Sequence, residues 1–211
     1  MSLMFKAFFL IFEPAVAWDR IAQVRRGFAF VLGWHLLPMI LMGAVAEGWS
    51  IHRWGKWQPR FHWFKEFSLH DIVVIESLQA ALLLVSVLLG ALMLLKISQT
   101  FHSRRKYLDA FTTVAYSYSP LLLARLVDAS PGVNPAVSWT LGIALTIWVL
   151  YQGIPRVMQP DPTHAFGLYL SGLFLIVLTS GMARLLPALY LLGEVDLHHS
   201  WLTHKFPNLF Q

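Results

Sequence analysis

Long apolar runs separated by short polar connections dominate the pattern of this chain of 211 residues. A helix rises about 1.5 Å per residue, so about 20 apolar residues cross a hydrocarbon core of about 30 Å. The pattern therefore predicts an all-α transmembrane bundle of five spans, which together form one domain over residues 27–192. The expected spans cover residues 27–48, 72–95, 110–128, 136–154 and 165–192, with the last crossing ending near Arg184.

The third run, residues 110–128, has polar residues and a proline at its centre. Pro120 has no backbone N–H to donate to the carbonyl of Tyr116, so the helix is expected to break there. Tyr118, Arg125 and Asp128 fall on one helical face. Two interpretations stay open: a kink in a packed span, or a polar face for a ligand or a transported solute.

Residues 1–26 combine aromatic and basic residues, and Glu13 and Pro14 interrupt their apolar run. The segment does not have the pattern of a signal peptide. Pro14 suits the first turn of a helix, and apolar residues follow at helical spacing. We expect an amphipathic helix lying at the membrane interface, anchored by Phe5, Phe8, Phe9, Phe12 and Trp18.

Two further segments carry polar or aromatic residues of interest. His35 lies within the first apolar run, where a packing residue with one hydrogen bond is the expected role and a proton path is the alternative. Residues 49–71 are too polar to span a membrane, and they interleave tryptophan and phenylalanine with basic residues. This composition is typical of a loop in the headgroup layer.

Composition supports a membrane protein, because 57% of the residues are hydrophobic and only 13% are charged. The net charge of +5 comes from basic residues scattered between the apolar runs, which argues against nucleic-acid binding. The chain has no cysteine, which excludes disulfides, thiolate metal sites and a cysteine nucleophile.

Basic residues are distributed unequally between the two sets of connections. If the N-terminus is cytoplasmic, nine basic residues lie inside and five lie outside, which agrees with the positive-inside rule. The inner residues at the first span and in the basic loop at 96–107 are the expected surface for a partner or for lipid headgroups. These residues are Arg25, Arg26, Arg104, Arg105 and Lys106.

The same topology brings ionisable residues of several spans to the outer end of the bundle. Charges at membrane depth are costly unless they are paired, so we expect the two arginines to bridge the acids. A polar cavity for an ion or a headgroup is the alternative. The expected intramembrane polar cluster consists of Tyr116, Tyr118, Pro120, Arg125, Asp128, Glu47, Glu76 and Arg184.

Histidines and hydroxyl residues offer little further chemistry. His198, His199 and His204 of the polar tail, residues 193–211, could meet other outer histidines around a metal, but their spacing matches no ligand motif. Ser117 and Ser119 have no histidine or carboxylate at the spacing of a catalytic triad. The sequence therefore predicts no cofactor and no enzymatic activity.

Three stretches resemble the Yip-domain family of membrane proteins. They are EPAVAWDRI at 13–21, AFTTVAYSYSP at 110–120 and WVLYQGIPRVM at 148–158. The resemblance implies five spans with a cytoplasmic N-terminus. Eukaryotic members lie in endoplasmic reticulum and Golgi membranes and interact with prenylated Rab GTPases, whereas the compact form here is similar to the bacterial branch. The expected location is accordingly the bacterial cytoplasmic (inner) membrane.

Together these patterns favour a non-enzymatic membrane protein that organises membranes or binds partners as a scaffold. The expected partners are the lipid bilayer and other membrane proteins, or a second copy of the chain. Two alternatives stay open. The chain is an accessory subunit of a larger membrane complex, or it is a small transporter or channel that uses the broken third span.

Overall fold

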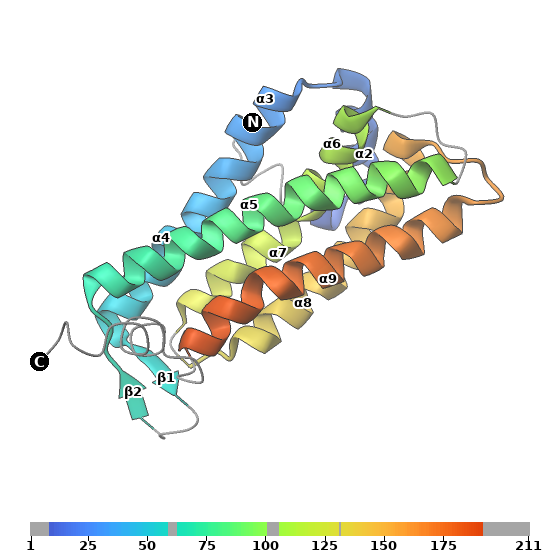
Figure 1. Cartoon of the computed structure of the whole chain (residues 1–211). Helices are drawn as coiled ribbons and strands as arrows, with labels where there is room; N and C mark the ends of the chain where they lie inside the picture. Colours follow the sequence, from blue (N-terminus) through green and yellow to red (C-terminus); the bar gives the residue numbers. More distant parts are fainter. Residues whose placement is uncertain (1–8, 59–62, 101–105, 131, 192–211) are drawn as a thin grey trace, which may run out of the picture.

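A computed structural model describes residues 9–58, 63–100, 106–130 and 132–191 of the chain. Helices make up most of this part, and they lie lengthwise beside one another (Figure 1). Their bounds are α2 Pro14–Val24, α3 Phe28–Val31, η1 Leu32–Leu36, α4 Leu37–Trp54, α5 Leu69–Thr100, α6 Tyr107–Ser117, α7 Ser119–Ala124, η2 Arg125–Ala129, α8 Pro135–Gly153, η3 Ile154–Met158 and α9 Ala165–Leu191.

Four continuous helical stretches are long and apolar enough to cross a membrane. Large apolar side chains are exposed along them, including Leu41, Val73, Leu141 and Phe174. Faces of this kind are suited to lipid tails, since a soluble protein exposes only small apolar patches. The chain is therefore a multi-pass membrane protein. The four stretches are Phe28–Trp54, Leu69–Thr100, Ala136–Met158 and Ala165–Leu185.

The third apolar run forms the centre of the bundle. Every residue from Ala110 to Leu122 is buried. Helix α6 packs on α5, α7 packs on α8, and η2 packs on α4, while α9 packs on α5 and α8. The central position explains why this run is apolar on nearly all sides.

The predicted break in the third run is present at Tyr118, where α6 ends and α7 begins. The N–H of Tyr118 still bonds to the carbonyl of Val114 at 3.0 Å, and its own carbonyl accepts from Leu122 at 2.9 Å. Pro120 occupies the first turn of α7, a position where a missing N–H costs little. The break thus divides the segment without ending its course through the bundle.

Most predicted spans agree with the observed helices, and the differences concern the first two. The first helical stretch continues to Trp54, six residues past the expected end at 48, and η1 inserts a π-helical turn around His35. The second begins earlier, at Leu69, because Ser68 and Asp71 form a cap: Asp71 N donates to Ser68 Oγ at 3.1 Å. The last run agrees with the prediction: α9 continues to Leu191 with Pro187 inside it, and the part apolar enough to cross a membrane ends at Leu185, next to Arg184.

The purely helical prediction omits a small antiparallel ribbon in the aromatic segment after α4. Strands β1 (Lys56–Gln58) and β2 (Trp63–Lys65) pair with Lys56 opposite Lys65. Gly55 precedes the ribbon with φ of 69°, which lets the chain leave the helix abruptly. The ribbon lies at one end of the bundle and α2 lies at the other (Figure 1).

Candidate functional site

Six charged side chains form an ion-pair network at the ribbon end of the bundle. Three are acidic (Glu47, Glu76 and Asp128) and three are basic (Lys56, Arg125 and Arg184), so their formal charges cancel. They come from α4, α5, η2, β1 and α9. Burial of such groups is costly, and mutual pairing is what makes it tolerable.

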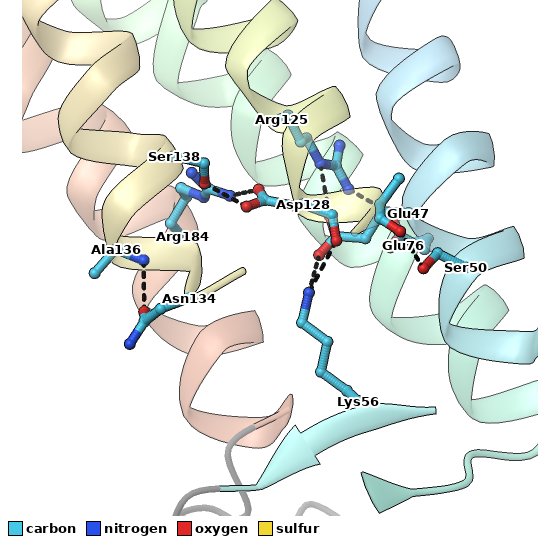
Figure 2. A network of polar contacts seen from close by, with 11 residues as sticks. Glu47, Ser50, Lys56, Glu76, Arg125, Asp128, Asn134, Ala136, Ser138 and Arg184 are labelled. Atoms are coloured by element: carbon cyan, nitrogen blue, oxygen red, sulfur yellow. Dashed lines mark hydrogen bonds and ion pairs between the residues drawn. The ribbon is translucent and has the colours of Figure 1, made fainter. Parts of the chain in front are cut away.

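Arg125 bridges two of the acids in this ion-pair network (Figure 2). Its Nε donates to Glu47 Oε2 at 3.1 Å, and its Nη2 donates to Glu76 Oε2. Only 2% of Arg125 is exposed. A Cβ added to Gly43 would lie 3.1 Å from Arg125 Cδ, so the absence of a side chain there lets the arginine pass close to α4.

Asp128 lies one helical turn after Arg125 and joins three more elements. Its carboxylate accepts from Arg184 Nη2 of α9 and from Ser138 Oγ of α8. Its backbone carbonyl accepts from Lys56 Nζ at 3.1 Å. Lys56 Nζ also lies 3.8 Å from Glu47 Oε1, which closes the network.

The ion-pair network explains why η2 and β1 are held against the helices. It joins them through Lys56 of β1, which bonds to the Asp128 carbonyl of η2, and through Arg125 of η2, which bonds to Glu47 of α4. Burial lowers the pKa of the Lys56 ammonium below its ordinary value, and the Glu47 carboxylate opposes that change.

Tyr118, which the sequence places in the same cluster, has separate partners. Its hydroxyl lies 2.7 Å from Thr179 Oγ1 and donates to Ser86 Oγ at 3.5 Å. A cavity of about 20 Å³ separates Tyr118 from Arg125 and Arg184. That volume accommodates about one water molecule.

Tyr116 and His35 lie nearer the opposite end and form a second polar contact. The two rings pack with their centroids 4.1 Å apart and their planes tilted by 31°. His35 Nε2 lies 2.9 Å from Ser119 Oγ, one residue before Pro120. The π-helical turn of the first stretch and the break of the third therefore meet at one hydrogen bond. This observation agrees with the expectation of a packing histidine with a hydrogen bond.

The expected polar cluster is thus divided in the structure. Glu47, Glu76, Arg125, Asp128 and Arg184 come together, but Tyr116, Tyr118 and Pro120 do not join them.

Trp18 of α2 is buried, so its predicted role as an interfacial anchor is wrong. Its Nε1 donates to the carbonyl of Val149 on α8 at 2.8 Å. Its ring meets Tyr116 edge-on, with centroids 6.1 Å apart. A Cβ at Gly153 would lie 2.5 Å from the indole, so only glycine fits beneath the ring. Helix α2 is therefore part of the bundle.

The contacts of Trp18 with Val149, Tyr116 and Gly153 form the Trp18 junction, and an ion pair at the surface lies beside it. Arg156 Nε donates to Asp19 Oδ1 at 2.9 Å, and Arg156 Nη1 donates to the carbonyl and the side chain of Gln152 at 2.9 and 2.7 Å. The three stretches that carry the family resemblance therefore meet here, through Trp18, Tyr116 and Val149.

The predicted basic contact surface is described in part. Arg25, Arg26, Lys106 and Arg156 line one cavity. It lies at the end of the bundle opposite the ribbon, where α2 carries Trp18, which we call the Trp18 end (Figure 1). Arg104 and Arg105 lie outside the described residues, as do His198, His199 and His204. Within the described part of the chain, no three histidine, aspartate or glutamate side chains gather as metal ligands.

Sequence reasoning missed Lys56, Ser138 and Trp18 as contact residues. Lys56 belongs to an aromatic and basic segment. The sequence of this segment has no periodicity that would show that it turns back toward the helices. Val149, the partner of Trp18, lies 131 positions away in sequence, and Asp128, the partner of Ser138, lies 10 positions away across the turn between η2 and α8. The available signal for Trp18 was that its motif recurs in a family.

Comparison with known protein families gives a match over most of the chain. The model of the Yip1 domain family matches residues 8–184, which include the Trp18 junction and all six members of the ion-pair network. No curated protein matches the chain, and no solved structure matches it. The match covers most of the chain, and the chain therefore belongs to the Yip1 domain family.

Proposed function

We propose that the protein is a non-enzymatic scaffold that crosses the membrane five times and binds other membrane proteins. The central segment α6–η2 supplies the additional crossing. Near its start, the Tyr107 ring packs against Phe28 with centroids 6.3 Å apart. Near its end, the Asp128 carbonyl accepts from Lys56. The segment thus extends along the bundle from the start of the first stretch to a point just beyond its end.

The distribution of basic residues supports a cytoplasmic Trp18 end. Arg20, Arg25, Arg26, Lys106 and Arg156 lie in or beside α2, α6 and η3, at that end. The positive-inside rule then places the ribbon outside. A bacterial cytoplasmic membrane is the location we propose.

The pairing of the buried charges is the observation that carries the scaffold proposal. A transport route needs polar groups that exchange partners with a solute along a path. Here Arg125 contacts two acids at once, and Asp128 is held by Arg184 and Ser138. The cavity beside Tyr118 has only about 20 Å³. These contacts favour a fixed frame over a moving carrier.

Partner binding is tested by site-specific photo-crosslinking in intact membranes. A photoreactive residue replaces Gln23, which is exposed on α2, and a control carries it at His70, exposed at the other end. We expect protein adducts of defined mass from position 23, and fewer of them when Arg25 and Lys106 are changed to Glu. Solute flux into proteoliposomes, with no protein adduct at position 23, would instead favour a transporter.

A further inference from the structure

Two cavities lie next to each other at the Trp18 end of the bundle. One has a volume of about 280 Å³ and a mostly apolar lining, which includes Leu10, Ala17 and Val31. The other has a volume of about 320 Å³ and a basic lining. Ile21, Arg26 and Thr112 line both cavities, so the apolar and basic cavities adjoin.

The basic cavity has the charge that an anion requires. Arg25, Arg26, Lys106 and Arg156 line it, and Asp109 is the acid among its lining residues. Asp109 Oδ2 accepts from the backbone N–H of Lys106, at the start of α6. With the Asp19 carboxylate paired to Arg156, the formal charges leave an excess of two positive charges.

The partial charges of helix ends change the net charge around the basic cavity but not its sign. The C-terminal ends of α2 and η3 face the basic cavity through Arg25 and Gln159, and each carries roughly half a negative charge. The N-terminal end of α6, beside Lys106, contributes roughly half a positive charge. A positive excess remains.

Several of the cations are held in place by the fold. The Arg156 guanidinium is fixed by Asp19 and Gln152. The Arg26 guanidinium lies over the Phe30 ring, 4.0 Å from its centroid. For Arg25 it is the backbone that is fixed, with a φ of 41° and an N–H bonded to the carbonyl of Ile21 at 3.2 Å. Positive charges held in this way need less ordering when an anion binds.

The two cavities together match an amphiphile with a negative head. A soluble anion would use the basic cavity alone, and a neutral apolar molecule would use the other alone. Anionic lipids are concentrated in the cytoplasmic leaflet, and basic pockets between helices are suited to their headgroups. An acyl chain that enters the apolar cavity replaces contacts with other lipids by contacts with the protein, so it gains little free energy. The headgroup therefore supplies most of the selectivity.

We propose that the two cavities bind one anionic phospholipid. Its phosphate lies among Arg25, Arg26, Lys106 and Arg156, and one acyl chain enters the apolar cavity between α2, α3 and α6. This inference goes beyond the scaffold proposal and relies on it only for the assignment of this end to the cytoplasmic leaflet. The bound lipid joins α2 to α6 and η3, beside the Trp18 contacts that join α2 to α6 and α8.

The test uses the full chain in mild detergent and native mass spectrometry. Phosphatidylglycerol and phosphatidylcholine with identical chains are titrated separately. We expect one phosphatidylglycerol to be retained per chain at concentrations where phosphatidylcholine is not. Arg26→Gln and Lys106→Gln should each weaken the affinity by about tenfold, because each removes a charge-assisted contact. Arg53→Gln, at the opposite end, is the matched control and should leave it unchanged.

Two additional measurements complete the test. One separates the contribution of the headgroup from that of the acyl chain, and the other separates a loss of lipid binding from a loss of folding. Soluble glycerol phosphate at the same concentration should displace little of the lipid, because it lacks the chain. The midpoint of thermal unfolding is measured for every variant, and lipid affinities are compared among variants whose midpoints lie within a few degrees of the wild type. Arg26→Lys, which keeps the positive charge, should retain the lipid. Equal retention of both lipids, full displacement by glycerol phosphate, or unchanged affinity in Arg26→Gln and Lys106→Gln overturns the proposal. The assay requires neither a partner nor an orientation, so its failure would leave the scaffold proposal standing.

Discussion

Trp18 donates its indole N–H to the carbonyl of Val149, 131 positions further along the chain, at 2.8 Å. The contact fixes α2 against α8 before the first membrane helix begins. Because Tyr116 of the central segment also packs on the indole, one side chain joins the three stretches that resemble the family. Trp18 is therefore the residue through which the N-terminal helix becomes part of the bundle.

The Gly153→Ala variant tests how tightly Trp18 is packed. A Cβ at position 153 would lie 2.5 Å from the indole, so either the ring or α8 must shift. We expect the free energy of unfolding to fall by about 1–3 kcal/mol, the usual cost of an overfilled core. Thermal unfolding in detergent measures it. The control is Gly33→Ala, where a Cβ would meet nothing within 4 Å. A loss no larger than in this control would contradict the packing described.

The Arg125→Leu variant tests the ion-pair network. Glu47 and Glu76 would then lie buried without their shared guanidinium. We expect a loss of about 3–5 kcal/mol in the free energy of unfolding, as for other buried pairs that lose one partner. Adding Glu47→Gln and Glu76→Gln should recover part of the loss.

Arg53→Leu is the matched control for that experiment, since Arg53 is exposed near the same end of the bundle. Its effect should stay within about 0.5 kcal/mol. If Arg125→Leu proved as mild as Arg53→Leu, the network would not stabilise the fold, and a functional role for its charges would need to be considered again.

Lys56 gives the stability a predictable pH dependence. Burial lowers the pKa of its ammonium in the folded protein below the ordinary 10.5, although Glu47 opposes this change. The unfolded chain therefore binds this proton more tightly, and stability rises with pH between the folded pKa and 10.5. We expect the wild type to gain stability relative to Lys56→Met as the pH rises through that window. Chemical denaturation of both proteins at several pH values measures the difference, and a constant or falling difference would refute the prediction.

The His35 and Ser119 contact is suited to a double-mutant cycle. His35→Ala and Ser119→Ala each remove one partner of a hydrogen bond 2.9 Å long. The cycle should give a coupling free energy of about 0.5–1.5 kcal/mol. Unfolding of the two single variants and the double variant in detergent supplies the numbers. Additive losses would mean that the π-helical turn and the helix break are independent.

The helical architecture could be predicted because it depends on local signals. Apolar runs of sufficient length locate the helices, and Pro120 locates the break at Tyr118. The cost of unpaired charge in a membrane also indicates that Arg125 and Arg184 need acidic partners. Helix ends were less accurate, because the capping of α5 by Ser68 and the extension of α4 to Trp54 depend on a few residues.

The remaining features depend on contacts between distant residues, which a single sequence does not reveal. The sequence around Trp18 has the pattern of an interfacial anchor. Only the packing shows that Gly153 of α8 leaves room for the indole ring. Lys56 belongs to a segment typical of a headgroup loop, but the ribbon turns its ammonium toward Glu47. Arg156 joins Arg25 and Arg26 only through the packing of η3 beside α2.

Labelling of single cysteines in intact cells tests the five-crossing proposal most directly, since the chain has no cysteine of its own. Cysteines replace Gln23, His70, Gly132 and Thr163 one at a time, all at exposed positions. A membrane-impermeant maleimide should label positions 70 and 132 in intact cells, and positions 23 and 163 only after permeabilisation. Protection of position 132 together with labelling of position 163 would contradict the proposal, because the central segment would then not cross the membrane.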